Sequence, residues 1–197
     1  IDLHSGGIER FAFQYGLSLD IAYDLTLDTF RAFRKELANF DEHEPLVHAH
    51  YKLLLKKLSH YQLSIQAQDG ILLFKEDEVL HSEIIQLNGK YRAPFILSVF
   101  HGLDTERIAS IMKSSTADVE LNIQRAMELM GGDNLSKRLA MIEKSYERLP
   151  LQFQASQILG TVSQVERPKK LKRKSVLWSM IGALLLLVSI LAIQDLF

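Results

Sequence analysis

The spacing of hydrophobic and polar residues predicts a chain built from helices. Through most of the sequence apolar residues recur three or four positions apart, which places them on one face of an α-helix. This spacing predicts single helices at residues 8 to about 15, 21 to about 38, 45–63 and 136–148, and three helices within residues 90–130. The predicted fold class is therefore all-α, with two small helical units.

Residues 90–130 have the apolar rhythm and the breaks of a helix-turn-helix. A first helix, tolerating Pro94 near its first turn, ends at His101-Gly102, and a second begins at Asp104 or Thr105. After a turn at residues 113–115, a third helix directs Val119, Ile123, Ala126 and Met127 to the core. Its outer face would enter a DNA major groove and consists of Thr116, Ala117, Asp118, Glu120, Leu121, Asn122, Gln124 and Arg125.

These residues resemble region 4 of bacterial sigma factors of the extracytoplasmic-function type. The shared features are Tyr91-Arg92 with the apolar residues after it, Gly102-Leu103, Ile108-Ala109, Val119 and Arg125-Ala126. In that family this region contacts the −35 element of the promoter. The resemblance implies that the chain acts in transcription initiation.

The third helix departs from the family in its charge. It carries Asp118, Glu120 and Glu128, and Arg125 is its one cation. Affinity for DNA depends on neutralised phosphates, so we expect weak duplex binding unless a partner supplies the attraction. Asn122 and Gln124 remain able to read adenine edges. The alternative is that this face is the solvated side of a structural three-helix unit.

Within residues 8–40, Asp24-Leu25 is followed by Asp28, Thr29 and Phe30, with Arg31 and Arg34 behind them. This part resembles sigma region 2, which docks on the clamp helices of RNA polymerase. The resemblance implies that these seven residues contact polymerase. Leu27 stands where the family commonly has Gln. For the acidic residues the alternative is a solvated helix face.

In sigma factors the next helix captures the −10 element with a Trp and an arginine-rich tail, and the helix predicted at residues 45–63 has neither. The nearest substitutes are an aromatic residue for stacking and basic residues for phosphates: His48, Tyr51, Lys52 and Lys56. His48 and His50 form an HxH pair without Cys or acidic partners at zinc spacing. We therefore expect surface histidines and no metal site.

Residues 175–194 contain no charged side chain, and about twenty apolar residues suffice to cross a bilayer. Trp178 fits the aromatic interface belt, and the preceding basic run at 167–174, with Lys172, Arg173 and Lys174 at its end, fits the positive-inside rule. These features predict a single-pass protein of the cell membrane whose N-terminal domains are cytoplasmic. A buried soluble helix is the alternative for the apolar stretch.

Composition adds few restrictions. The chain has 197 residues and a formal net charge of −1, and it contains no Cys, which excludes disulfides and thiolate zinc sites. Ile1 in place of Met suggests a missing N-terminus. The expected organisation is a region 2-like domain at 1–63, a linker at 64–75, a region 4-like domain at 76–132, a helical and juxtamembrane extension at 133–166, the basic cluster at 167–174 and the transmembrane helix at 175–194.

No catalytic motif and no cofactor-binding motif was found, so no enzymatic role is predicted. Three functions remain open. The chain is a membrane-tethered sigma factor that binds RNA polymerase core and promoter DNA, a degenerate sigma-like regulator that binds polymerase or another sigma factor, or a membrane signalling protein with a sigma-shaped domain. An anti-sigma or other regulatory protein is a further expected partner.

Overall fold

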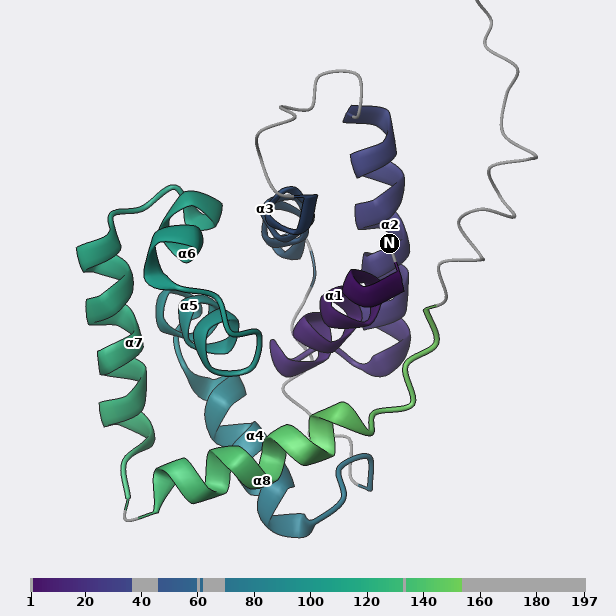
Figure 1. Cartoon of the computed structure of the whole chain (residues 1–197). Coiled ribbons are helices and arrows are strands. Elements are labelled where there is room, and N and C mark those ends of the chain that lie inside the picture. Colours follow the sequence, from purple (N-terminus) through teal and green to yellow (C-terminus); the bar gives the residue numbers. More distant parts are fainter. Residues whose placement is uncertain (1, 37–45, 60, 62–69, 133, 154–197) are drawn as a thin grey trace, which may run out of the picture. The chain divides into compact units, whose positions relative to one another are not determined.

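The computed structural model describes residues 2–36, 46–59, 61, 70–132 and 134–153. Within these ranges every regular element is an α-helix, as the sequence predicts (Figure 1). The helices are α1 (Asp2–Gln14), α2 (Leu19–Glu36), α3 (Leu46–Leu58), α4 (Lys75–Gln86), α5 (Gly89–Val99), α6 (Thr105–Met112), α7 (Thr116–Met130) and α8 (Leu135–Glu147). The described helices belong to one compact unit, Ile1–Ile158.

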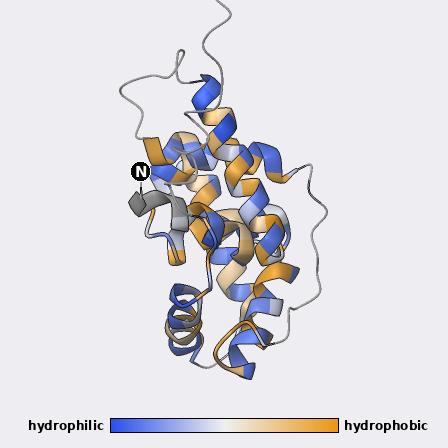
Figure 2. Ribbon diagram, turned by 90° about the vertical axis from the view of Figure 1, so that its right-hand side faces the viewer, coloured by the Kyte–Doolittle hydropathy of each residue, from blue (hydrophilic) through white to orange (hydrophobic). Residues whose placement is uncertain are grey.

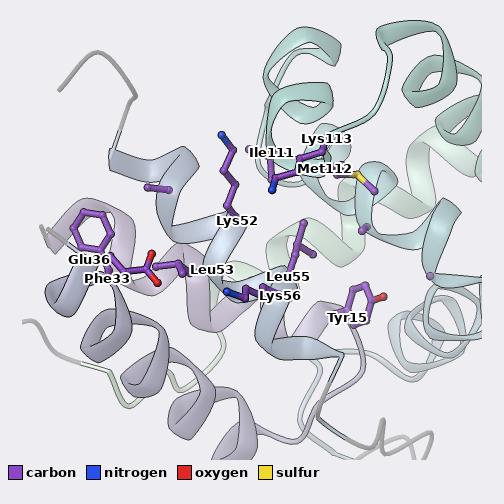
Figure 3. A pocket seen from close by; sticks show the side chains of 13 residues that line it. Tyr15, Phe33, Glu36, Lys52, Leu53, Leu55, Lys56, Ile111, Met112 and Lys113 are labelled. Atoms are coloured by element: carbon purple, nitrogen blue, oxygen red, sulfur yellow. The ribbon is translucent and has the colours of Figure 1, made fainter. Parts of the chain in front are cut away.

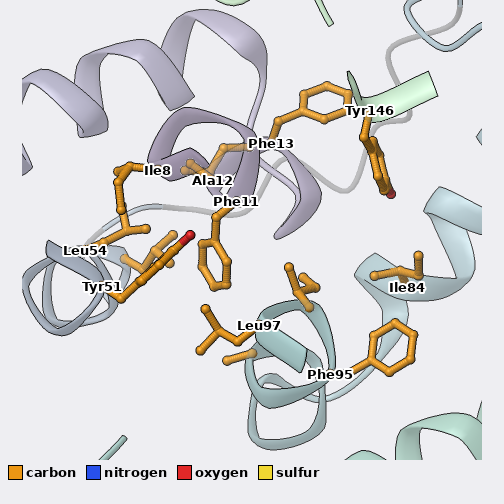
Figure 4. Close-up of a cluster of buried hydrophobic side chains, with 14 of the residues drawn as sticks. Ile8, Phe11, Ala12, Phe13, Tyr51, Leu54, Ile84, Phe95, Leu97 and Tyr146 are labelled. Carbon is orange, nitrogen blue, oxygen red and sulfur yellow. The ribbon is translucent and has the colours of Figure 1, made fainter. Parts of the chain in front are cut away.

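Helix α1 is the centre of the core. Phe11 points from it toward Tyr51 and Leu54 of α3 and Leu97 of α5, and Phe13 points toward Tyr146 of α8 (Figure 4). The apolar side chains of α1 through α8 form one continuous buried cluster. Figure 2 shows hydrophobic and hydrophilic residues alternating along the helices, as expected of helices that bury one face. The two helical units expected from the sequence therefore share one core.

The connection between α1 and α2 is a tight turn at Gly16. Its φ of +110° favours glycine, and an added Cβ would lie 3.2 Å from Ile85 of α4. Arg92 of α5 supports this corner, because its guanidinium donates to the carbonyl oxygens of Tyr15 at 2.9 Å and Leu87 at 2.6 Å. Buried carbonyl groups at two chain bends are thereby satisfied by one side chain.

Helix α4 was not predicted as a separate helix. Its core-facing positions include Asp77 and His81 beside Leu80, Ile84 and Ile85, so polar residues interrupt the apolar stripe. Both polar side chains are paired with α8: Ser145 donates to Asp77, and the His81 ring lies 2.9 Å from the Tyr146 hydroxyl.

Two details of the helix-turn-helix prediction are wrong. Pro94 lies inside α5, beyond the first turn, where its missing N–H cannot donate to the carbonyl of Lys90 one turn earlier. Met127 is 37 % exposed, whereas Val119 and Ala126 are buried as predicted. Of the predicted helical and juxtamembrane extension at 133–166, residues 154–166 lie outside the described residues.

Candidate nucleic-acid interface

Helices α6 and α7 form a helix-turn-helix whose turn is fixed by side-chain caps. Asp104 caps α6 by accepting the Arg107 N–H at 2.8 Å, and Lys113, which has a left-handed φ of 55°, is the C-cap that follows α6. Ser115 caps α7 by accepting the Asp118 N–H at 3.1 Å, while its hydroxyl donates to the Asp118 carboxylate at 2.6 Å. Of the two starts predicted for the second helix, Asp104 or Thr105, the structure has Thr105, and the third helix begins directly after the predicted turn, at Thr116.

Helix α7 turns its predicted DNA-reading face outward. Val119 and Ala126 are buried against the other helices of this part of the chain, and Asn122 is half-buried. The exposed members of the predicted set are Thr116, Ala117, Asp118, Glu120, Leu121, Gln124 and Arg125. Leu121 is 63 % exposed, so this face combines carboxylates with an apolar side chain.

The single cation of α7 is already paired. The Arg125 guanidinium lies 2.8 Å from the Glu128 carboxylate, which also accepts a hydrogen bond from Gln124 at 3.0 Å. These hydrogen bonds lower the pKa of Glu128 and raise that of Arg125. A phosphate would have to compete with Glu128 for Arg125, which strengthens the expectation of weak duplex binding.

The predicted polymerase-binding residues of α2 divide into two groups. Leu25, Thr29 and Phe30 are buried, and the Thr29 hydroxyl donates to the Leu25 carbonyl at 2.7 Å. The remaining four lie at the surface and are Asp24, Asp28, Arg31 and Arg34. Only this second group is available to a partner in the observed arrangement. Their role in binding polymerase stays a prediction.

Tyr61 was missed by the sequence reasoning. It lines a surface hollow of about 460 Å³ together with Ile21, Asp24, Asp28 and Arg31. Burial and the neighbouring carboxylates of Asp28 and Asp24 raise the pKa of its phenol. Tyr61 follows α3 in the chain without a motif of its own, and only the packing brings it to α2.

The residues expected at the −10 element are also divided. His48 and Tyr51 are buried, and the Tyr51 hydroxyl lies 2.8 Å from Nδ1 of His101, whose Nε2 lies 2.8 Å from Oε1 of Gln14. Burial lowers the pKa of His101 to about 3, so this ring is neutral and joins α3 to α1 through hydrogen bonds. In this arrangement Tyr51 is a core residue.

Lys52 and Lys56 line a groove of about 910 Å³ between α3 and α6. Ile111, Met112 and Lys113 lie across the groove from them (Figure 3). The helix expected at the −10 element therefore faces the scaffold helix of the helix-turn-helix.

The expectation of surface histidines is wrong, because His48 and His50 are both buried. The His50 ring lies against Phe33 and Phe30, with ring centroids 4.2 and 4.5 Å away. Among the described residues no group of His, Cys, Asp and Glu side chains has the arrangement of a metal site.

The predicted membrane anchor, Trp178 with Lys172, Arg173 and Lys174, lies outside the described residues. Within the described ranges no helix has the length and apolar character needed to cross a membrane.

Comparison with known proteins places the helix-turn-helix in a family. Residues 77–130 match the family model described as Sigma-70, region 4. A similar fold is found in the sigma factor RpoE of Bartonella quintana, solved in complex with the anti-sigma factor NepR, at 19 % identity and a TM-score of 0.53 over 72 % of this chain and 92 % of that chain. No curated protein matches the sequence. The predicted resemblance of residues 90–130 to sigma region 4 is confirmed by this match, and the fold of the larger part of the chain is similar to that of a sigma factor.

Proposed function

We propose that this chain is a membrane-tethered, sigma-factor-like regulator of transcription initiation that binds RNA polymerase core. The observation that carries the proposal is the capped α6–α7 helix-turn-helix within the Sigma-70 region 4 match. The outward charges of α2, at Asp24, Asp28, Arg31 and Arg34, are the proposed polymerase contacts. The tether is residues 175–194, with the helical domain on the cytoplasmic side.

Promoter DNA is a proposed partner of an opened form of the protein. The numbers −35 and −10 are positions along the promoter, so the two elements lie about 25 base pairs apart, which is roughly 85 Å along B-DNA. Here α3 packs directly on α6, and α7 has 15 residues and is about 22 Å long. One such unit does not span both elements, so promoter binding requires α1–α3 to separate from α4–α8.

A second candidate is a regulator without promoter recognition. The pairing of Arg125 with Glu128 and the exposed Asp118 and Glu120 favour it, because they leave α7 little positive charge for phosphates. Such a protein would use the same surfaces to bind polymerase, another sigma factor or an anti-sigma protein. The similar RpoE structure contains an anti-sigma factor, which supports a regulatory protein as a partner.

The deciding experiment is capture of core RNA polymerase by the full chain held in detergent, followed by run-off transcription. The test variant is Asp24→Lys with Asp28→Lys, and the matched control is Glu143→Lys with Glu147→Lys on exposed positions of α8. Loss of capture in the first variant alone supports the polymerase contact. Capture with transcription selects the first candidate, and capture without transcription selects the second. If wild-type protein captures no polymerase, the proposal fails.

Extraction of membranes with high salt and with alkaline carbonate tests the tether separately. A C-terminal segment that spans the bilayer keeps the chain in the membrane fraction at high salt and at alkaline pH. Extraction by alkaline carbonate would contradict it.

A further inference from the structure

The segment that follows α8, residues 149–153, returns across the molecule to α1 and α2. The carboxylate of Glu9 on α1 is buried and accepts the backbone N–H of Gln152 at 3.0 Å and that of Phe153 at 2.9 Å, one on each oxygen. Hydrogen bonds to a charged acceptor are among the stronger ones in proteins. A carboxylate with no exposed surface therefore serves as a docking point for an extended peptide.

Aromatic packing adds to these hydrogen bonds. The ring of Phe153 stacks on Phe30 of α2, with centroids 5.0 Å apart and planes inclined by 14°, and Phe153 is only 6 % exposed. The end of α8, from which the segment emerges, is also bonded to α1, because Nε of Arg10 donates to the carbonyl of Tyr146 at 3.0 Å. The segment thus has a polar and an apolar attachment to the α1–α2 pair.

At its other end the segment continues from α8, and α8 is bonded to α4. Arg138 binds both oxygens of Glu83 at 2.8 Å, and Tyr146 and Ser145 bond to His81 and Asp77. Helix α4 begins the part of the chain that resembles region 4, whereas α1 and α2 lie in the region 2-like part. Residues 149–153 therefore connect the two parts by a second route besides the chain between α3 and α4.

We propose that residues 149–153 are an intramolecular latch that occupies a peptide-docking site on α1 and α2 and holds the two sigma-like parts together. Release of the latch removes one of the attachments that hold the two parts together, beside the bonds of Arg92 and of His101, and thereby favours opening. Phe153 of the latch also covers Phe30, one of the residues expected to contact polymerase, so release uncovers part of a docking surface. This last step rests on the proposed function. When the latch is released, water replaces the two N–H donors at Glu9, so the carboxylate keeps hydrogen-bond partners in both states and the latch can close again.

Glu9→Gln tests the latch, since an amide offers one oxygen where the carboxylate offers two. Asp20→Asn is the matched control: it removes the same charge from an exposed residue, which accepts only a 3.3 Å hydrogen bond from the Gln152 side chain. Phe153→Ala is a second variant that removes the aromatic attachment. Because the chain has no Cys, two cysteines introduced at Lys35 on α2 and Gln124 on α7 label it specifically for distance measurement.

In full-length protein, amide exchange at residues 152 and 153 is expected to accelerate at least about tenfold in Glu9→Gln, and in Asp20→Asn less than about twofold. The population with a long distance between the labels on α2 and α7 should rise in Glu9→Gln and Phe153→Ala. Unchanged exchange in Glu9→Gln overturns the docking role of Glu9. Faster exchange with an unchanged distance distribution in both variants overturns the latch.

Affinity for core polymerase is measured on the same samples. The opened variants should bind at least about tenfold more tightly than wild-type protein and Asp20→Asn, which corresponds to about 1.4 kcal/mol. Equal binding by opened and closed proteins overturns the covering of a polymerase surface. Absence of binding in every sample, with the labels still moving apart, refutes the proposed function and leaves the latch established.

Discussion

Converting the outer face of α7 to a basic surface should restore duplex binding if this helix faces the groove. The chosen change is Glu120→Lys with Glu128→Gln, which adds one exposed cation and removes the carboxylate paired with Arg125 at 2.8 Å. Asp118 is left in place, because its carboxylate accepts the Ser115 hydroxyl and supports the start of α7. The variant therefore alters charge without removing a helix cap.

In this variant the affinity for duplex DNA should depend more steeply on salt concentration than in wild-type protein. Two new phosphate contacts, by the introduced lysine and by Arg125, change the slope of log K against log salt by about 1.8, equivalent to roughly a twelvefold greater loss of affinity between about 50 and 200 mM salt. Fluorescence anisotropy of a labelled duplex, titrated at several salt concentrations, measures this slope.

The matched control carries the same charge change on α8, as Glu143→Lys with Glu147→Gln at exposed positions. It reports any general gain from net charge, which should be small and should leave the slope nearly unchanged. If both variants have the slope of wild-type protein, or if both steepen it equally, α7 is not a groove-facing helix. That result would favour the regulator without promoter recognition.

Three further predictions concern the shared core. Phe11→Ala should lower the free energy of unfolding by about 3–5 kcal/mol, because Phe11 is fully buried. Helices α1–α3 and α4–α8 should still unfold together in one calorimetric transition, and two separate transitions would contradict a common core. Burial lowers the pKa of His81 from 6.5 to about 4, so the unfolded chain binds the proton more readily than the folded chain. About 3 kcal/mol of stability should therefore be lost as pH falls from 6.5 to 4. Urea unfolding at several pH values measures this loss, which should be smaller in His81→Gln. Ser115→Ala should lower stability by about 0.5–2 kcal/mol through loss of the α7 cap, and an unchanged urea midpoint would refute the cap.

The sequence predicted those elements whose helix signals are local. The starts of α6 and α7 follow from Asp104 and Ser115, and the stop after α5 follows from Gly102, which has a φ of +62°. These are interactions between residues a few positions apart, so spacing and residue type suffice to predict them.

Contacts distant in sequence could not be predicted in this way. Helix α4 was overlooked because Asp77 and His81 occupy core positions, and only their bonds to α8, 65 or more residues further along the chain, make those positions acceptable. Tyr51 is typical of a base-stacking residue by its type and place, yet in this arrangement it is bonded to His101 in the core. Which of a helix's polar and aromatic residues face outward depends on partners that a local pattern does not contain.

The closed arrangement connects these observations to mechanism. The resemblance to sigma factors predicts that polymerase or DNA contacts three residues that are not free to do so in this arrangement. Tyr51 and Phe30 are buried, and Lys52 lines the groove beside the helix-turn-helix. Opening must therefore break the hydrogen bonds at His101 and at Glu9, both of which involve α1. A partner that binds the opened form better than the closed form shifts this equilibrium only by the ratio of its two affinities. Under the proposed function, polymerase alone suffices if that ratio exceeds the closing equilibrium constant. Otherwise a second factor acting on residues 149–153 is required before α2 can bind polymerase.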